Sequence, residues 1–84
     1  MQVKDLRVLV AGCGSIGLRH AGVLRDLGVV EMAACDPSEK SRQALAEQDS
    51  ACRLYADYAE ALTTENPDAV FLLTPTRLHI EMAK

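Results

Sequence analysis

Three glycines near the start of the chain have the spacing of a loop that could hold a phosphate group. In the stretch VLVAGCGSIGLRH they are Gly12, Gly14 and Gly17, which together make the pattern GxGxxG. In such a loop the first glycine permits a tight turn, the second lets the backbone approach a pyrophosphate, and the third lets the next helix pack closely on the sheet. The backbone amides of Ser15 and Ile16 would then face the phosphates at the positive end of that helix.

An acidic residue follows the loop at a distance that is typical of dinucleotide binding. Asp36 ends the next apolar run, 19 positions after Gly17. A carboxylate there accepts hydrogen bonds from ribose hydroxyls and repels a 2′-phosphate, so the pattern predicts NAD as the cofactor. Lys40 or Arg42 could still accommodate NADP. The alternative role for Asp36 is that of a helix cap, and the two roles are compatible.

The apolar pattern places the glycine loop between a strand and a helix. Residues 6–11 form a short, nearly continuous aliphatic run, which is typical of a strand buried on both faces. From Ser15 to Gly28 the apolar residues recur every three or four positions, which is typical of a helix that ends at a glycine. The loop therefore opens a strand–loop–helix unit, the context that a phosphate-binding loop requires.

The rest of the chain continues the same alternation of strands and helices. Further strands are predicted over residues 29–35, 52–55 and 69–73. Further helices are predicted from Ser38, over ADYAEAL with Asp57 as its N-cap and a break over 63–68, and from Leu78 onward. For the helix that starts near Ser38, either Asp36 with Glu39 or Ser38 alone could provide the cap.

This order of elements, βαβαβαβα, predicts an α/β fold that is Rossmann-like, with a parallel sheet in strand order 3-2-1-4. The ligand crevice of such a sheet lies between the carboxyl ends of its first and fourth strands, so the glycine loop and Thr74-Pro75-Thr76 would lie on its two sides. A complete dinucleotide fold ordinarily has six strands. We therefore expect residues 1–84 to form a partial dinucleotide-binding domain, which continues in a longer chain or associates through the free edge of its fourth strand.

Composition argues against several other classes of protein. The net charge is −3 and no run of like charge exceeds two residues, so we expect no nucleic-acid or membrane partner. No apolar run approaches the roughly 20 residues that span a bilayer, and the N-terminal run is too short for a secretory signal. We expect a cytoplasmic protein with a small-molecule substrate and, in its full-length form, an ability to form homo-oligomers. The three cysteines lack metal-binding spacing and predict reduced thiols without a metal site.

Two residues beside the loop allow alternative interpretations. Cys13 lies near a helix N-terminus, which could lower the pKa of its thiol and permit a redox role, whereas an ordinary structural thiol is the plainer interpretation. His20 is expected to pack rather than to catalyse, because the first helix lies under the pyrophosphate and away from any reacting hydroxyl.

These stretches together resemble the N-terminal part of the Gfo/Idh/MocA family of oxidoreductases. The resemblance rests on AGCGSIGLRHAGVL, ACDPS, YADYAEAL and PDAVFLLTPTRLHIEMA, and its most specific part combines Thr74-Pro75 and His79 with His20. It implies hydride transfer between a nicotinamide cofactor and a hydroxyl-bearing carbon of a sugar, cyclitol or sugar nucleotide. It also implies that Thr74 and Pro75 line the ribose and nicotinamide side of the cofactor, with His79 just beyond them at the start of the last helix. The alternative for these residues is an ordinary strand-to-helix turn.

The resemblance also bears on catalysis. The family's catalytic lysine belongs to a Glu-Lys-Pro segment after the next strand, and its substrate pocket belongs to a C-terminal domain; no residue of this chain matches either. We therefore assign no catalytic residue here and expect the chain to hold the cofactor with little or no turnover. A stand-alone NAD-sensing domain without catalysis is the alternative function.

Overall fold

The computed structural model describes residues 3–73 and 78–82. Its helical elements are η1 (Val3–Asp5, a short 3-10 helix), α1 (Ser15–Asp26), α2 (Glu39–Gln48) and α3 (Tyr58–Glu65). Its strands are β1 (Arg7–Ala11), β2 (Glu31–Cys35), β3 (Arg53–Tyr55), β4 (Ala69–Leu73) and β5 (Leu78–Met82). They form one sheet in the order β3-β2-β1-β4-β5, and the pairings among β1 to β4 are parallel. The predicted α/β class and the predicted strand order 3-2-1-4 are confirmed.

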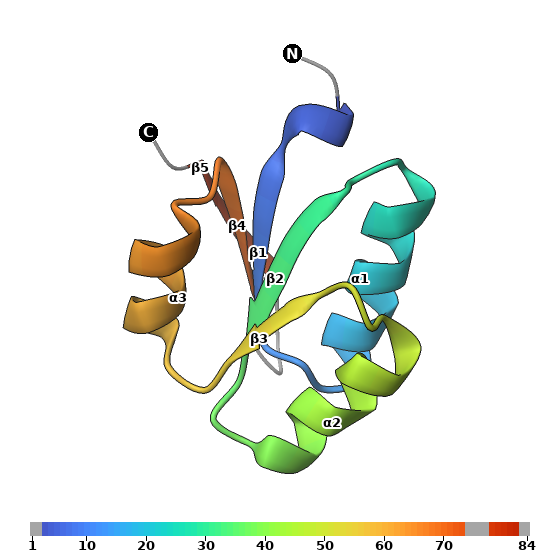
Figure 1. The fold of residues 1–84 in the computed structure, drawn as a ribbon, viewed down its shortest axis with the longest axis vertical. Coiled ribbons are helices and arrows are strands. Elements are labelled where there is room, and N and C mark those ends of the chain that lie inside the picture. Colours follow the sequence, from blue (N-terminus) through green and yellow to red (C-terminus); the bar gives the residue numbers. More distant parts are fainter. Residues whose placement is uncertain (1–2, 74–77, 83–84) are drawn as a thin grey trace.

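Helices cover both faces of this sheet, α1 and α2 on one face and α3 on the other (Figure 1). Along β1 the side chains alternate between the two layers: Val8 and Val10 pack with the α1 and α2 side, and Leu9 packs with Ala61 of α3. Val8, Leu9 and Val10 are all buried. This two-sided burial explains why the strand is aliphatic at every position after Arg7.

Capping residues determine where the later helices begin. The Ser38 hydroxyl accepts a hydrogen bond from the Ser41 amide at 3.2 Å, so Ser38 is the N-cap of α2. Asp57 caps α3 as predicted, because its carboxylate accepts from the Glu60 amide at 3.0 Å. The third helix runs further than predicted, to Glu65, and ends where Asn66 adopts a left-handed conformation with φ of 47°.

The prediction of a helix from Leu78 is wrong. Residues 78–82 form β5, which pairs antiparallel with β4 from Leu73↔Leu78 to Ala69↔Met82. Two physical reasons account for the difference. The apolar residues at 78, 80 and 82 alternate with a period of two, which fits a strand. In addition, β5 provides ladder partners for the outer edge of β4, which would otherwise present unpaired backbone groups.

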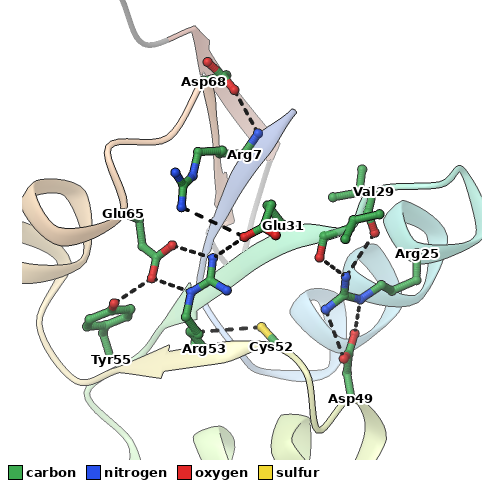
Figure 2. Close-up of polar contacts among 11 residues, drawn as sticks. Arg7, Arg25, Val29, Glu31, Asp49, Cys52, Arg53, Tyr55, Glu65 and Asp68 are labelled. Carbon is green, nitrogen blue, oxygen red and sulfur yellow. Dashed lines mark hydrogen bonds and ion pairs between the residues drawn. The ribbon is translucent and has the colours of Figure 1, made fainter. Parts of the chain in front are cut away.

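A network of charged side chains ties the amino ends of three strands to the end of α3 (Figure 2). Arg53 donates to both carboxylate oxygens of Glu65 at 2.8 Å, and the Tyr55 hydroxyl donates to Glu65 Oε2 at 2.6 Å. Glu31 lies 3.2 Å from Arg53 and 3.9 Å from Arg7. The Glu65 side chain is buried, and these partners satisfy it. Hydrogen bonds from Arg53 and Tyr55 outweigh burial and hold the pKa of the Glu65 carboxyl below its usual range.

A second arginine joins the end of α1 to the end of α2. Arg25 donates to the Asp49 carboxylate at 2.6 and 3.2 Å, and also to the backbone carbonyls of Val29 and Val30. Figure 2 shows this guanidinium between the carboxylate and the entry to β2. The contact fixes the C-terminal end of α1, so that its other end is directed at the carboxyl edge of the sheet.

None of the helices in the described part of the chain is long and apolar enough to cross a membrane.

Glu65 should make the stability of the protein sensitive to acid. Because its folded-state pKa is lowered, its contribution is present above the unfolded value near 4.5 and is lost as the pH falls through the folded value. We expect Glu65→Gln to lower the free energy of unfolding at neutral pH by about 1.5–3 kcal/mol, the range for hydrogen bonds to charged groups. It should also flatten the decline in stability between about pH 5 and pH 3. Urea denaturation across this pH range measures both effects.

The matched control is Glu47→Gln, since Glu47 is exposed on α2. It should leave the stability and its pH dependence unchanged within about 0.5 kcal/mol. If both variants lost stability with acid as steeply as the original chain, the role assigned to Glu65 would be wrong.

Candidate functional site

The glycine loop leaves β1 through a turn that only glycine adopts easily. Gly12 has φ of +119°, and a Cβ atom there would lie 3.2 Å from the Leu73 carbonyl oxygen at the end of β4. The Gly12 amide donates to the Cys35 carbonyl at 2.8 Å, so the first loop residue is bonded to the end of β2. The loop therefore begins between the carboxyl ends of β2 and β4.

Gly17 brings α1 directly against this loop. A Cβ atom at Gly17 would collide with the Gly12 carbonyl oxygen and would lie 2.9 Å from the Gly12 carbonyl carbon. The obstacle is backbone, which cannot swing aside as a flexible side chain would. Only glycine, whose side chain is a single hydrogen atom, therefore lets the helix start at this place.

Gly14 is different, because a Cβ atom there would meet no protein atom within 4 Å. Its φ of −68° and ψ of −167° are open to other residues. Gly14 is the N-cap of α1, and no side chain caps this helix end. The open space lies beside the amides of the first turn, where the helix dipole is positive. An open, uncapped helix start is the geometry with which phosphate-binding loops accept an anion close to the backbone.

Two adjoining clefts lie along the carboxyl edge of the sheet. The first has a volume of about 310 Å³ and is lined by Gly12, Gly14, Ser15, Ile16, Gly17, Asp36 and Leu73. The second has a volume of about 410 Å³ and is lined by Ala11, Gly12, Cys35, Asp36, Pro37, Ala56, Tyr58, Leu72 and Leu73. The two clefts share Gly12, Asp36 and Leu73, so together they form one elongated site.

Six of the residues predicted for the site come together around the first cleft. They are Gly12, Gly14, Ser15, Ile16, Gly17 and Asp36. Thr74 and Pro75 lie outside the described residues. His79 is on β5, paired in register with Leu72, and not at the start of a helix as predicted.

Asp36 lies at the junction of the two clefts, and its carboxylate contacts two loops. Oδ2 accepts from the Cys13 amide at 2.9 Å, and Oδ1 accepts from the Ser38 amide at 2.8 Å. Asp36 is therefore not the N-cap of α2, although it supports the turn that precedes Ser38. A carboxylate has about four acceptor positions, so two further donors can be accepted.

The redox role considered for Cys13 is wrong. Its side chain is fully buried, and burial together with the nearby Asp36 charge raises the pKa of its thiol to about 12. Desolvation outweighs any benefit from the helix end, because the sulfur faces the core and not the first-turn amides. Cys13 is a packing residue beneath the loop.

His20 is half-buried on α1, and its packing role stays a prediction. Its Nδ1 lies 2.9 Å from the Ile16 carbonyl oxygen one turn earlier in α1. Since a carbonyl can only accept, Nδ1 is the protonated nitrogen.

Within the described part of the chain, no group of three or more His, Cys, Asp or Glu side chains could hold a metal ion.

The lining residues that the sequence analysis missed include Leu72, Leu73 and Tyr58. Each had a detectable signal. The two leucines end the most apolar run of the chain immediately before Thr74, and Tyr58 follows the cap Asp57 just after the third strand. Residues at the carboxyl ends of parallel strands line the crevice of this class of fold.

The parallel strands β1 to β4 and the glycine loop before α1 define the class of the fold, a Rossmann-like α/β domain. The sequence model of the Gfo/Idh/MocA group, described as an oxidoreductase family with an NAD-binding Rossmann fold, matches residues 6–84. The chain belongs to this family.

Two relatives fit this assignment. The chain is 36% identical, over 80 residues, to 4-carboxy-2-hydroxymuconate-6-semialdehyde dehydrogenase from Sphingobium sp. strain SYK-6, a match that covers 93% of this chain and 25% of that protein. The crystal structure of myo-inositol 2-dehydrogenase from Lactobacillus plantarum superimposes with a TM-score of 0.72 at 33% identity, over 84% of this chain and 22% of the other. The chain thus spans about a quarter of the length of each relative.

The loop glycines should differ sharply in their effect on stability. Gly17→Ala forces a methyl group into backbone and should lower the free energy of unfolding by roughly 2 kcal/mol or more. Gly14→Ala enters open space in an allowed conformation and should leave stability unchanged or raise it by about 0.4–1 kcal/mol. Thermal and urea denaturation of the two variants provide the measurement. Equal stabilities would contradict the close approach of α1 to the loop.

Proposed function

We propose that this chain is the NAD-binding part of an oxidoreductase that transfers hydride between the nicotinamide and a hydroxyl-bearing carbon of a sugar, cyclitol or sugar nucleotide. The observation that carries the proposal is the open space at Gly14, which lies beside the uncapped start of α1 in the same cleft as Asp36. When bound, the cofactor supplies the hydride acceptor or donor. The chain supplies binding and orientation.

The two clefts divide the cofactor between them in this proposal. The first cleft receives the pyrophosphate on the amides of Ser15 and Ile16, where the positive end of α1 faces it. The second cleft, between the ends of β2, β3 and β4, receives the adenosine half. Asp36 lies where the two clefts meet and accepts hydrogen bonds from the adenosine ribose.

The choice of NAD over NADP rests on the charge of Asp36. Asp36 lines both clefts, so in the proposed orientation a 2′-phosphate at the ribose would meet a like charge. The nearby cation Arg42 is already engaged, because Nη1 donates to the Asp36 carbonyl at 2.7 Å. Binding of NADP would require this guanidinium to leave that contact.

The substrate class rests on the family resemblance. One relative is named for myo-inositol, which is a cyclitol, and the other for a semialdehyde. Both are dehydrogenases, which supports the reaction type. The assignment of a sugar, cyclitol or sugar nucleotide extends that likeness to a protein of which this chain supplies the cofactor-binding part.

Among the described residues that line the clefts, the ionisable side chains are Cys35, Asp36 and Tyr58, and all three lie in the second cleft. Burial raises the pKa of the Cys35 thiol to about 11, so it stays protonated. In the proposed orientation these groups surround the adenosine half, far from a reacting hydroxyl. Among the described lining residues none is positioned as a base for the substrate, and this supports a chain that by itself binds the cofactor without turning it over.

Titration calorimetry with NAD and NADP tests the cofactor assignment. We expect NAD to bind. NADP should bind with an affinity at least about tenfold lower, which corresponds to about 1.4 kcal/mol of repulsion. Gly14→Ala, which the fold should tolerate, should weaken NAD binding at least tenfold because its methyl group occupies the approach of the pyrophosphate. Tighter binding of NADP than of NAD would contradict the choice of cofactor. Unchanged affinity in a folded Gly14→Ala variant would contradict the placement of the pyrophosphate.

Turnover by the chain alone is tested separately. With NAD and myo-inositol in excess, we expect no NADH formation above the rate without protein, because no described lining residue places a base at the substrate. Absorbance of NADH is the readout, and a saturating NAD titration verifies that cofactor is bound. Steady NADH formation in proportion to the chain concentration would overturn this expectation.

A further inference from the structure

We propose that Asp36 is a positioning residue for the glycine loop: its carboxylate holds the loop in its phosphate-binding shape before any cofactor arrives. This inference rests on the proposed function and deepens it. It assigns to Asp36 a contribution to phosphate binding, separate from its contact with the ribose.

All four polar groups of Asp36 are in use without a ligand. Its amide donates to the Tyr55 carbonyl at 3.0 Å, and its carbonyl accepts from Arg42 at 2.7 Å. Its two carboxylate oxygens accept from the amides of Ser38 and Cys13 at 2.8 and 2.9 Å. The residue is therefore fixed from β3, from α2 and from its own loop, so the carboxylate is a rigid acceptor for the remaining contact, the one to Cys13.

The contact to Cys13 determines the orientation of a peptide inside the glycine loop. Cys13 lies between the turn residue Gly12 and the helix cap Gly14, and its side chain is buried. Together with the bond from the Gly12 amide to the Cys35 carbonyl, the carboxylate anchors two successive loop amides to the end of β2. A bond from a backbone amide to an ionised acceptor is stronger than a neutral one, and this one is partly buried.

The two roles of Asp36 are compatible, because each carboxylate oxygen keeps an acceptor position for a ribose hydroxyl. They make opposite predictions for an anion that has no ribose hydroxyls. Removal of a negative charge beside the phosphate site should by itself tighten anion binding. Loss of the loop anchor should weaken it, since the first-turn amides would no longer be held ready.

The first experiment measures the loop directly, by amide hydrogen exchange of the ligand-free chain. We expect Asp36→Ala to speed exchange of the Cys13 amide at least tenfold relative to amides in the middle of β1. Asp36→Asn, which keeps one acceptor oxygen, should give a smaller increase. The control is Asp68→Asn, because Asp68 also accepts a backbone amide, that of Arg7 at 2.8 Å, but at the amino end of β1. Unchanged Cys13 exchange in both Asp36 variants would overturn the proposal.

The second experiment compares ADP with 2′,3′-dideoxy-ADP, which lacks the ribose hydroxyls. We expect Asp36→Ala to weaken dideoxy-ADP binding about tenfold, and ADP binding by a larger factor because the ribose contact is lost as well. If the variant bound dideoxy-ADP as tightly as the original chain or more tightly, Asp36 would act through the ribose alone and the proposal would fail. Should Asp36→Ala not fold, the same comparison is made with Asp36→Asn, for which a weakening of at least threefold is expected.

The two proposals fail in distinguishable ways. If the original chain bound neither ADP nor NAD, the proposed function would be wrong, while the exchange measurement would still decide the role of Asp36 in the loop. If ADP bound normally and Cys13 exchange did not respond to Asp36, only the positioning role would be wrong.

Discussion

The close approach of Gly17 to the Gly12 carbonyl is the constraint on which the rest of the site depends. No side chain fits between α1 and the loop at this point, so the helix starts against the end of β1. Its first-turn amides then face the carboxyl edge of the sheet, where the two clefts lie. Because this contact is between backbone atoms, it is rigid, and a rigid cradle loses little free energy to ordering when an anion binds.

Stability and binding are separated between the two ends of the sheet. At the amino ends, Arg53 links the buried Glu65 of α3 to Glu31 of β2, and this network serves the fold. At the carboxyl ends, the backbone amides of α1 and the carboxylate of Asp36 face solvent-accessible clefts. Asp36 contributes to both loop structure and binding in this account, because the carboxylate oxygens that hold the loop keep acceptor positions for a ligand. Parallel strands make this separation possible, since all of their carboxyl ends lie at one edge.

Most of the elements could be predicted because each has a local cause. Two-sided burial makes the interior of β1 and the whole of β4 apolar, and the polar caps Ser38 and Asp57 determine where α2 and α3 begin. The exception is β5, for which the helical prediction failed. A short apolar stretch is compatible with either period, and the choice depended on the free edge of β4, a feature that exists only once the sheet has formed.

The sequence by itself determined the order of elements up to β4, the glycine pattern and the acidic residue that follows the second strand, because the spacing and its strand–helix context are sufficient to predict a phosphate-binding loop. Only the tertiary structure decided how these parts act on one another. It buried Cys13 so that its thiol stays protonated, left Gly14 open, and directed the Asp36 carboxylate onto the loop amide. The physical reason is that burial and hydrogen bonding across strands depend on which segments become neighbours, and that information is not local in the chain.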